Sequence, residues 1–181
     1  LKELQKIMDT YPQMNICVAL ATSFGCPFEG IPPIQKVVDF TKRVYDMGIR
    51  SICLADTIGI ADPRQVRDTI HAVTEVMPDC EFQIHIHDTR GMGQANTLAA
   101  IECGIKTVQS TLGGLGGCPF ATAASGNLST EDVVWALNEM GYDTGIDFEK
   151  LLAAAKYQKS FIDGIYSGHQ QNINTKTPPC C

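Results

Sequence analysis

The sequence lacks any long apolar run and any excess of positive charge. No stretch approaches the roughly 18 uninterrupted apolar residues of a membrane-spanning helix, and the opening Leu-Lys-Glu-Leu-Gln-Lys lacks the layout of a secretory signal peptide. Its 14 lysines and arginines against 20 aspartates and glutamates give a formal net charge of -6. Proteins that bind a phosphate backbone usually carry a basic patch. We therefore expect neither a membrane nor a nucleic acid as a partner.

Motifs for disulfides, structural zinc and nucleotide phosphates are also missing. None of the eight cysteines forms a Cys-x-x-Cys pair, and those at Cys17 and Cys53 lie in apolar strand patterns, where we expect them to pack. Reduced thiols in a compartment with the redox state of the cytosol fit best. No Gly-x-x-x-x-Gly-Lys-Ser/Thr or Gly-x-Gly-x-x-Gly pattern follows a predicted strand. The many glycines therefore favour a mobile loop over a phosphate cradle.

Apolar runs and amphipathic stripes alternate along the chain. The apolar runs predict buried parallel strands over residues 15–23, 51–56, 81–88 and 107–112. Helical spacing predicts helices over residues 1–11, after Pro33, after Asp62, over 93–103, after Ser129 and over 148–162. Gly48 and Gly104 each end a helix and lead into a strand, so the unit repeats. This alternation predicts a parallel sheet, either open and doubly wound or part of a (β/α)8 barrel.

The length decides how much of a barrel the chain can form. Four strands cannot close a barrel, and a whole one takes about 250 residues. We therefore expect an α/β fold that is a partial (β/α)8 TIM barrel, with about four βα units and a C-terminal helix and with the N-terminal strands missing. The first residue is not Met, and residues 1–11 resemble a helix already in progress, which indicates a truncated N-terminus. We expect a catalytic domain over residues 1–165 and a polar, mobile tail over residues 166–181.

Two histidines lie on one face of the third predicted strand. Because side chains alternate between strand faces, His85 and His87 point the same way, with their rings about 7 Å apart. The carboxyl ends of parallel strands form the functional edge of such folds, and imidazoles there need solvent, a metal or a substrate as partner. The plain alternative is a polar strand face. Imidazoles joined by carboxylate and amide oxygens favour octahedral Mg2+ or Mn2+ over a closed zinc site.

Three further residues belong to the same predicted edge. Asp56 ends the second strand and is a candidate base or supporting carboxylate, or else a strand-end Asp that binds loop backbone. Asn127 offers an amide oxygen to a metal but is also a typical turn former before a helix cap. Cys118 lies between glycines and a proline, where an exposed thiol could serve as acid or base. We interpret His71, in a helix, and His169, in the tail, as bystanders.

These motifs resemble those of the 3-hydroxy-3-methylglutaryl-CoA lyases, in the metal-dependent carbon-carbon lyase branch of TIM barrels. The most specific part is Gly113-Gly-Leu-Gly-Gly-Cys-Pro-Phe-Ala with Ala124-Ser-Gly-Asn-Leu and Thr130-Glu-Asp. His85-Ile-His-Asp-Thr and Leu54-Ala-Asp-Thr-Ile-Gly support the resemblance, which covers nearly the whole chain. Isopropylmalate and homocitrate synthases of this branch usually carry His-x-His-Asn-Asp and lack the Gly-Gly-Cys-Pro loop, which favours the lyases.

The resemblance implies a site and a reaction. By position, the family's metal ligands fall on His85, His87 and Asn127, its active-site thiol on Cys118 and its strand-end carboxylate on Asp56. The implied reaction is cleavage of 3-hydroxy-3-methylglutaryl-CoA to acetoacetate and acetyl-CoA, with Mg2+ or Mn2+ as Lewis acid and with Cys118, His85 and Asp56 as catalytic residues. The family's Arg-Asp pair on the first barrel strand, a catalytic cation and a metal ligand, is not in this sequence.

Two other functions stay open. A related metal-dependent acyl-CoA lyase or Claisen-type synthase of the same branch would use the same site, again with an acyl-CoA substrate as partner. A non-catalytic, metal-binding half-barrel would need a partner chain. The resemblance further implies that the full-length protein can form a homodimer and that it is cytoplasmic, or in the mitochondrial matrix of a eukaryote. The truncated chain is expected to be inactive alone.

Overall fold

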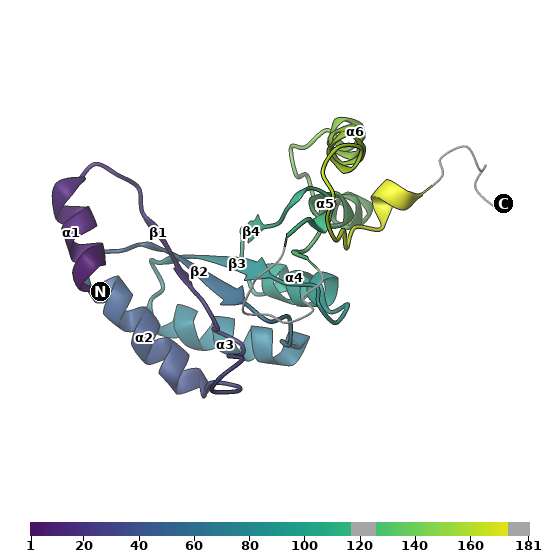
Figure 1. The fold of residues 1–181 in the computed structure, drawn as a ribbon. Helices are drawn as coiled ribbons and strands as arrows, with labels where there is room; N and C mark the ends of the chain where they lie inside the picture. Colours follow the sequence, from purple (N-terminus) through teal and green to yellow (C-terminus); the bar gives the residue numbers. More distant parts are fainter. Residues whose placement is uncertain (117–125, 174–181) are drawn as a thin grey trace.

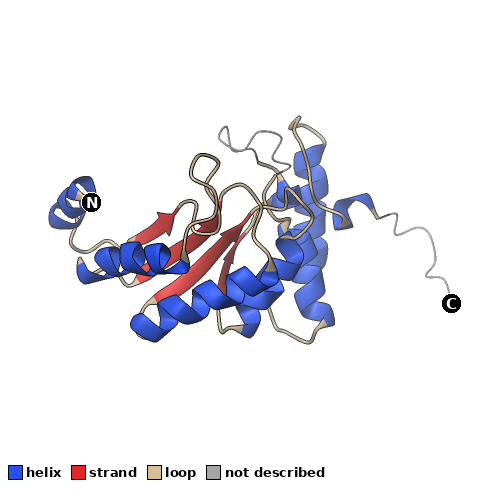
Figure 2. Ribbon diagram, turned by 90° about the horizontal axis from the view of Figure 1, so that it is seen from below, coloured by secondary structure: helices blue, strands red, loops and turns tan. Residues whose placement is uncertain are grey.

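A computed structural model describes residues 1–116 and 126–173, which contain one parallel sheet (Figures 1 and 2). Its strand order is β1-β2-β3-β4, with bounds Cys17–Leu20, Ser51–Asp56, Glu81–Ile86 and Thr107–Gln109. One helix joins each strand to the next: α2 (Ile34–Asp46), α3 (Pro63–Val76) and α4 (Gly93–Glu102). The predicted alternation and the predicted parallel pairing are confirmed.

The three crossover helices lie against one face of the sheet (Figure 1). Strand side chains on that face are buried or partly buried, and the helices add apolar stripes of their own; the fully buried members include Ile52, Leu54, Ile84, Ile86, Val44, Val66, Ile70 and Val73. Burying each such side chain contributes roughly 1.5–3 kcal/mol. This apolar layer is the core of the chain and fixes the strands whose ends carry the candidate site.

The opposite face of the sheet is polar. Gln83 Nε2 donates to Ser51 Oγ over 3.0 Å, and Gln109 Nε2 donates to Gln83 Oε1 over 3.1 Å, so one row of hydrogen bonds crosses three strands. Cys53 on this face is fully buried, and burial raises the pKa of its thiol to about 12, as expected for a packing residue. Cys17 is exposed, contrary to the expectation that it packs, because β1 is the edge strand of the described sheet.

The remaining helices flank the sheet. Helix α1 (Lys2–Thr10) lies beyond β1, while α5 (Thr130–Glu139) and α6 (Phe148–Lys159) lie beyond β4 (Figure 1). The predicted start of α3 is confirmed, since Asp62 Oδ1 accepts from the backbone N–H groups of Arg64 and Gln65. None of the described helices is long and apolar enough to cross a membrane.

Three of the four predicted strands are shorter than expected, and the third along the chain ends at Ile86 instead of residue 88. The first ends at Leu20, because Thr22 takes a positive φ of 62° and turns the chain. The last ends at Gln109 and is followed by the 3-10 turn η1 (Leu112–Gly114), in which Gly113 has a φ of 66°. A left-handed backbone of this kind is open to glycine without strain. The chain therefore leaves the sheet after Gln109, earlier than the apolar pattern indicated, and then enters the loop that starts at Gly113, here called the glycine loop.

Residues 166–173 of the predicted tail contact the rest of the chain. Residues 166–173 include the 3-10 turn η2 (Gln170–Asn172) and hydrogen-bond to α5 and to η1. Their polar composition predicted a tail because they carry no apolar stripe, whereas their contacts are hydrogen bonds to the Asp132 carboxylate and to backbone carbonyls. Residues 174–181 lie outside the described part.

Candidate metal centre

Strand β3 brings the two histidines together. His85 lies within the strand and His87 just past its end, with their Nε2 atoms 3.2 Å apart and their ring centroids 5.1 Å apart. The shared orientation was predicted, but the rings are closer than the expected spacing because His87 has left the regular strand. Adjacent ligands of an octahedral ion with bonds of about 2.1 Å are about 3 Å apart. The two nitrogens therefore fit neighbouring positions on one cation.

The surroundings of His85 favour the form that binds a metal. Burial lowers the pKa of His85, and the neighbouring His87 lowers it further, against an opposite effect of a hydrogen bond with Asn127. A neutral imidazole keeps a free lone pair, which a cation requires. The other ring nitrogen of His87, Nδ1, is buried and has no hydrogen-bond partner among the described residues. Within that part of the chain, His87 is therefore oriented by its backbone and by its contact with His85.

Backbone pairing delivers Asn127 to the histidines. Asn127 forms an isolated antiparallel bridge with His87, and Leu128 N–H donates to Ile86 O over 3.2 Å. The segment that follows the glycine loop thus lies alongside the end of β3. This pairing joins positions about 40 residues apart in sequence, so it is a tertiary contact that local periodicity does not reveal.

The side chain of Asn127 is fixed through its nitrogen. Nδ2 donates to Leu115 O over 3.2 Å, so the amide oxygen is the atom that can serve as acceptor or ligand. A Cβ at Gly116 would lie 2.2 Å from Asn127 Nδ2, so only glycine allows this close approach. Two imidazoles and one amide oxygen suit Mg2+ or Mn2+. The described ranges hold no group of three or more His, Cys, Asp or Glu residues that could bind a metal ion, so the third candidate ligand here is an amide.

Asp56 has a different environment from the one that a base at this site would need. Its pair in the strand register is Ile86, whereas Ala55 pairs with His85, so Asp56 points to the helix-covered face. Its Oδ1 accepts from Ile60 N–H over 3.1 Å and its Oδ2 from Ala61 N–H over 3.0 Å, with no exposed surface. These contacts match the alternative of a strand-end Asp that binds loop backbone.

The pKa of Asp56 reflects opposing effects. Burial is the largest and raises the pKa, while the backbone hydrogen bonds and the nearby His87 lower it. The direction of the net shift is upward. The carboxylate therefore closes the loop over residues 57–61 through its two backbone hydrogen bonds.

The proposed thiol, Cys118, lies in residues 117–125, outside the described part of the chain. The structure therefore brings together His85, His87 and Asn127, and places Asp56 at the end of the neighbouring strand β2, on the opposite face of the sheet.

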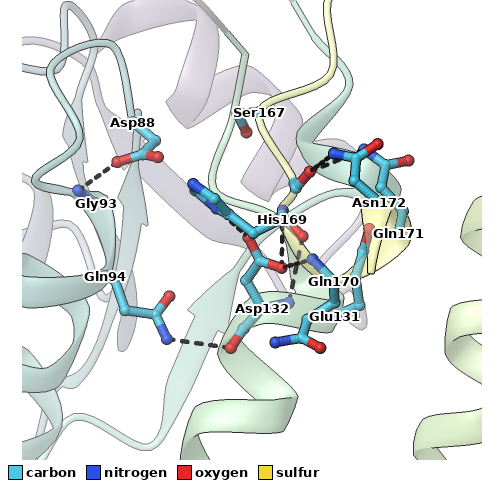
Figure 3. A network of polar contacts seen from close by, with 12 residues as sticks. Asp88, Gly93, Gln94, Glu131, Asp132, Ser167, His169, Gln170, Gln171 and Asn172 are labelled. Atoms are coloured by element: carbon cyan, nitrogen blue, oxygen red, sulfur yellow. Dashed lines mark hydrogen bonds and ion pairs between the residues drawn. The ribbon is translucent and has the colours of Figure 1, made fainter. Parts of the chain in front are cut away.

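Sequence reasoning missed two residues that support the site. Ser167 Oγ donates to Asn127 O over 2.8 Å, and Asp88 Oδ1 accepts from Gly93 N–H over 2.7 Å, which fixes the start of α4 next to His87. His169, interpreted as a bystander, contacts Asp132 (Figure 3). The sequence did carry a signal for Asp88, because an Asp five residues before the first glycine of a helix can accept from the N–H group of that glycine. The polar tail gave no signal for Ser167.

Comparison with protein families matches the family described as HMGL-like to residues 2–157. The human mitochondrial hydroxymethylglutaryl-CoA lyase is 44% identical over 153 residues, which cover 83% of this chain and 47% of that protein. The hydroxymethylglutaryl-CoA lyase YngG of Bacillus subtilis is 43% identical over 138 residues, which cover 76% of this chain and 46% of that protein. This chain thus spans less than half the length of these curated relatives.

Among solved structures, an HMG-CoA lyase from Acinetobacter baumannii, in complex with coenzyme A and 3-methylmalate, superposes with a TM-score of 0.87 at 36% identity. The similarity covers 98% of this chain and 59% of that one. The predicted partial TIM barrel is confirmed by this likeness.

Proposed function

We propose that this chain, which belongs to the HMGL-like family, carries the metal-binding part of a lyase that cleaves 3-hydroxy-3-methylglutaryl-CoA to acetoacetate and acetyl-CoA. The observation that carries the proposal is the convergence of the His85 and His87 Nε2 atoms to 3.2 Å beside Asn127. Relatives of about 44% identity that bear the lyase name support it. We assign the three residues as ligands of Mg2+ or Mn2+.

The reaction breaks the bond between carbons 2 and 3 of the acyl group. The hydroxyl proton leaves, the oxygen on carbon 3 becomes the ketone of acetoacetate, and the electron pair moves to carbon 2, which then takes up a proton. A bound divalent cation supplies Lewis acidity toward the substrate hydroxyl and carboxylate. His85 stays neutral at pH 7 because of its lowered pKa, and so keeps its lone pair for the cation. Cys118 is our candidate for the acid that protonates carbon 2.

We assign Asp56 to positioning. Both of its oxygens accept from backbone N–H groups of the loop over residues 57–61, so neither is free to take the hydroxyl proton without breaking a contact. Its contribution to the reaction is to hold this loop beside His87. The base for the hydroxyl proton then comes from a group other than Asp56.

An acyl-CoA is the proposed substrate class, supported by the relative from A. baumannii that is solved with coenzyme A and a hydroxy acid. The proposed location is the cytoplasm or the mitochondrial matrix, since curated relatives include forms named for both places. A related acyl-CoA lyase or Claisen-type synthase would share the ligands and differ in the acyl group.

A second candidate function is a metal-binding half-barrel that works only with a partner chain. The exposed Cys17 on the open face of β1 favours it, because the described residues leave that face uncovered.

Two measurements test these proposals. Mn2+ titrated onto the chain should bind, and His85→Ala and His87→Ala should each weaken binding by at least about tenfold. Unchanged affinity in both variants would remove the metal site. Full-length protein carrying this chain should release acetyl-CoA from 3-hydroxy-3-methylglutaryl-CoA when Mn2+ is present. Turnover only with a different acyl group would favour the related lyases, and metal binding without any turnover would favour the half-barrel.

A further inference from the structure

The segment after α6 contacts both the proposed ligand Asn127 and the turn that begins the glycine loop. Ser167 Oγ donates to Asn127 O over 2.8 Å, and Gly168 N–H donates to Gly113 O over 2.9 Å. The approach is close: Gly114 has a φ of +68°, and a Cβ there would lie 1.9 Å from Ser167 Oγ and 2.7 Å from Asn127 O. Ser167 therefore contacts Asn127, and the adjacent Gly168 contacts Gly113 at the start of the glycine loop.

One carboxylate anchors the segment to α5. Asp132, whose side chain is only 14% exposed, accepts from His169 N–H over 2.8 Å, from Gln170 N–H over 2.8 Å and from His169 Nδ1 over 2.9 Å (Figure 3). Hydrogen bonds to an ionised carboxylate are stronger than those between neutral groups. Asp132 also lies in the first turn of α5, where a negative charge is favourable. The segment is thus attached at a point that is itself rigid.

A second carboxylate, which is fully buried, contacts the turn η1 at Gly113. Glu131 has no exposed surface, and its Oε2 accepts from Gly113 N–H over 2.9 Å, while Gln171 Nε2 donates to Gly113 O over 3.4 Å. A Cβ at Gly168 would lie 2.9 Å from Ser129 Oγ and 3.0 Å from Glu131 Oε1. Burying a carboxylate is unfavourable unless it is hydrogen-bonded. The chain keeps these buried polar contacts at the one turn that leads into the glycine loop.

The network continues to the histidine pair. Gln94 Nε2 of α4 donates to Asp132 O over 3.1 Å, and α4 begins at Gly93, whose N–H donates to Asp88 Oδ1 (Figure 3). Asp88 directly follows His87 in sequence. The same anchor, Asp132, therefore connects the segment on one side with the end of β3 on the other.

We propose that residues 166–172 form a strap that positions Asn127 and the turn at residues 113–116, with Ser167 and Asp132 as its positioning residues. The inference rests on the proposed function, because it takes Asn127 as a metal ligand. The strap holds the backbone of Asn127 in place before a cation binds, so that less ordering is needed on binding. Loss of the strap weakens metal binding without removing a ligand.

The test compares strap variants with a matched helix-cap control in the complete chain. Ser167→Ala deletes one oxygen and should weaken Mn2+ binding by about two- to tenfold, the effect of one net hydrogen bond. Asp132→Ala should weaken it by at least about tenfold, as losses of groups that support a ligand do. The control is Asp147→Ala, because Asp147 caps α6 through Lys150 N–H and has no described hydrogen bond to the strap or to Asn127. This control should lower thermal stability and leave Mn2+ affinity unchanged.

A readout without metal separates this inference from the proposed function. The amide of Leu128, which donates to Ile86 O beside Asn127, should exchange its hydrogen faster in Ser167→Ala and Asp132→Ala than in the wild type, and at the wild-type rate in Asp147→Ala. Unchanged exchange at Leu128 in both strap variants would overturn the strap. Unchanged Mn2+ affinity in both, with lowered stability alone, would reduce the segment to a structural role and also overturn it. A wild-type chain that binds no Mn2+ would defeat the proposed function, while the exchange comparison would still decide the strap.

Discussion

Replacing Asp56 by Asn separates a loop-holding role from a role in proton transfer. Asp56 is fully buried and accepts from Ile60 N–H and Ala61 N–H with one oxygen each. Asparagine keeps one acceptor and places an amide N–H group against one of the two backbone donors. One backbone N–H then stays buried and unpaired, which costs about 1–3 kcal/mol.

This cost has a measurable consequence. In a chain of this size, 1 kcal/mol corresponds to a shift in Tm of about 2–4 °C, so Asp56→Asn should lower the Tm by about 2–12 °C. Asp56→Ala leaves both donors unpaired and should lower it by roughly twice as much. Urea unfolding followed by circular dichroism gives the free energies directly, and an unchanged m value would show that the denatured state is not altered.

The refuting result is equally concrete. If Asp56→Asn keeps the wild-type free energy of unfolding but abolishes turnover in the full-length protein, the carboxylate acts on the proton and the loop contacts are incidental. A loss of stability with turnover reduced less than about tenfold would support the positioning role, because removing a positioned base lowers rates by about 10²–10⁴.

Two further predictions concern the chemistry and its pH dependence. In the full-length protein, Cys118→Ser should leave Mn2+ affinity intact and lower the rate of acetyl-CoA release by about 10²–10⁴-fold. The control Cys53→Ser should lower stability instead, because it buries a hydroxyl. Near-full turnover of Cys118→Ser would make the thiol a bystander. Burial lowers the pKa of folded His85 below the unfolded value of about 6.5, so the unfolded state binds more protons in that window. The free energy of unfolding should therefore rise with pH through this window and fall as pH drops below about 6.5. Urea unfolding at pH 5 and 7.5 should show a smaller pH effect in His85→Ala than in the wild type. Equal effects would contradict a lowered pKa of His85.

Local sequence signals were sufficient where both ends of an element are marked. The strand over residues 51–56 lies between Gly48 and a loop that ends at Asp62-Pro63, and its bounds match the prediction. The same holds for the start of α3. The first, third and last strands were predicted too long, because the side-chain pattern continues after the backbone stops pairing at Leu20, Ile86 and Gln109. Hydrophobic periodicity records burial and does not record a change in φ.

The sequence predicted only part of the candidate site, because the residues of the site come together through tertiary contacts. Period-2 alternation predicted that His85 and His87 share a face, which holds. The same alternation could have placed Asp56 on the other face only if the register of β2 against β3 were known, and that register is fixed by burial of Ile52 and Ile84 against the helices. The strap has no apolar stripe at all, so its place depends on hydrogen bonds to Asp132 and to backbone carbonyls, which periodicity cannot detect.

Three carboxylates share one task around the histidine pair. Asp56, Asp88 and Asp132 each accept backbone N–H groups from the loop or segment next to them, and none of them is hydrogen-bonded to either imidazole in the described residues. These carboxylates therefore stabilise the backbone of the loops at this edge of the sheet. The candidate ligands that these contacts position are two imidazoles and an amide. Within the described residues the carboxylates therefore order the backbone around the site, and the ligand atoms come from other side chains.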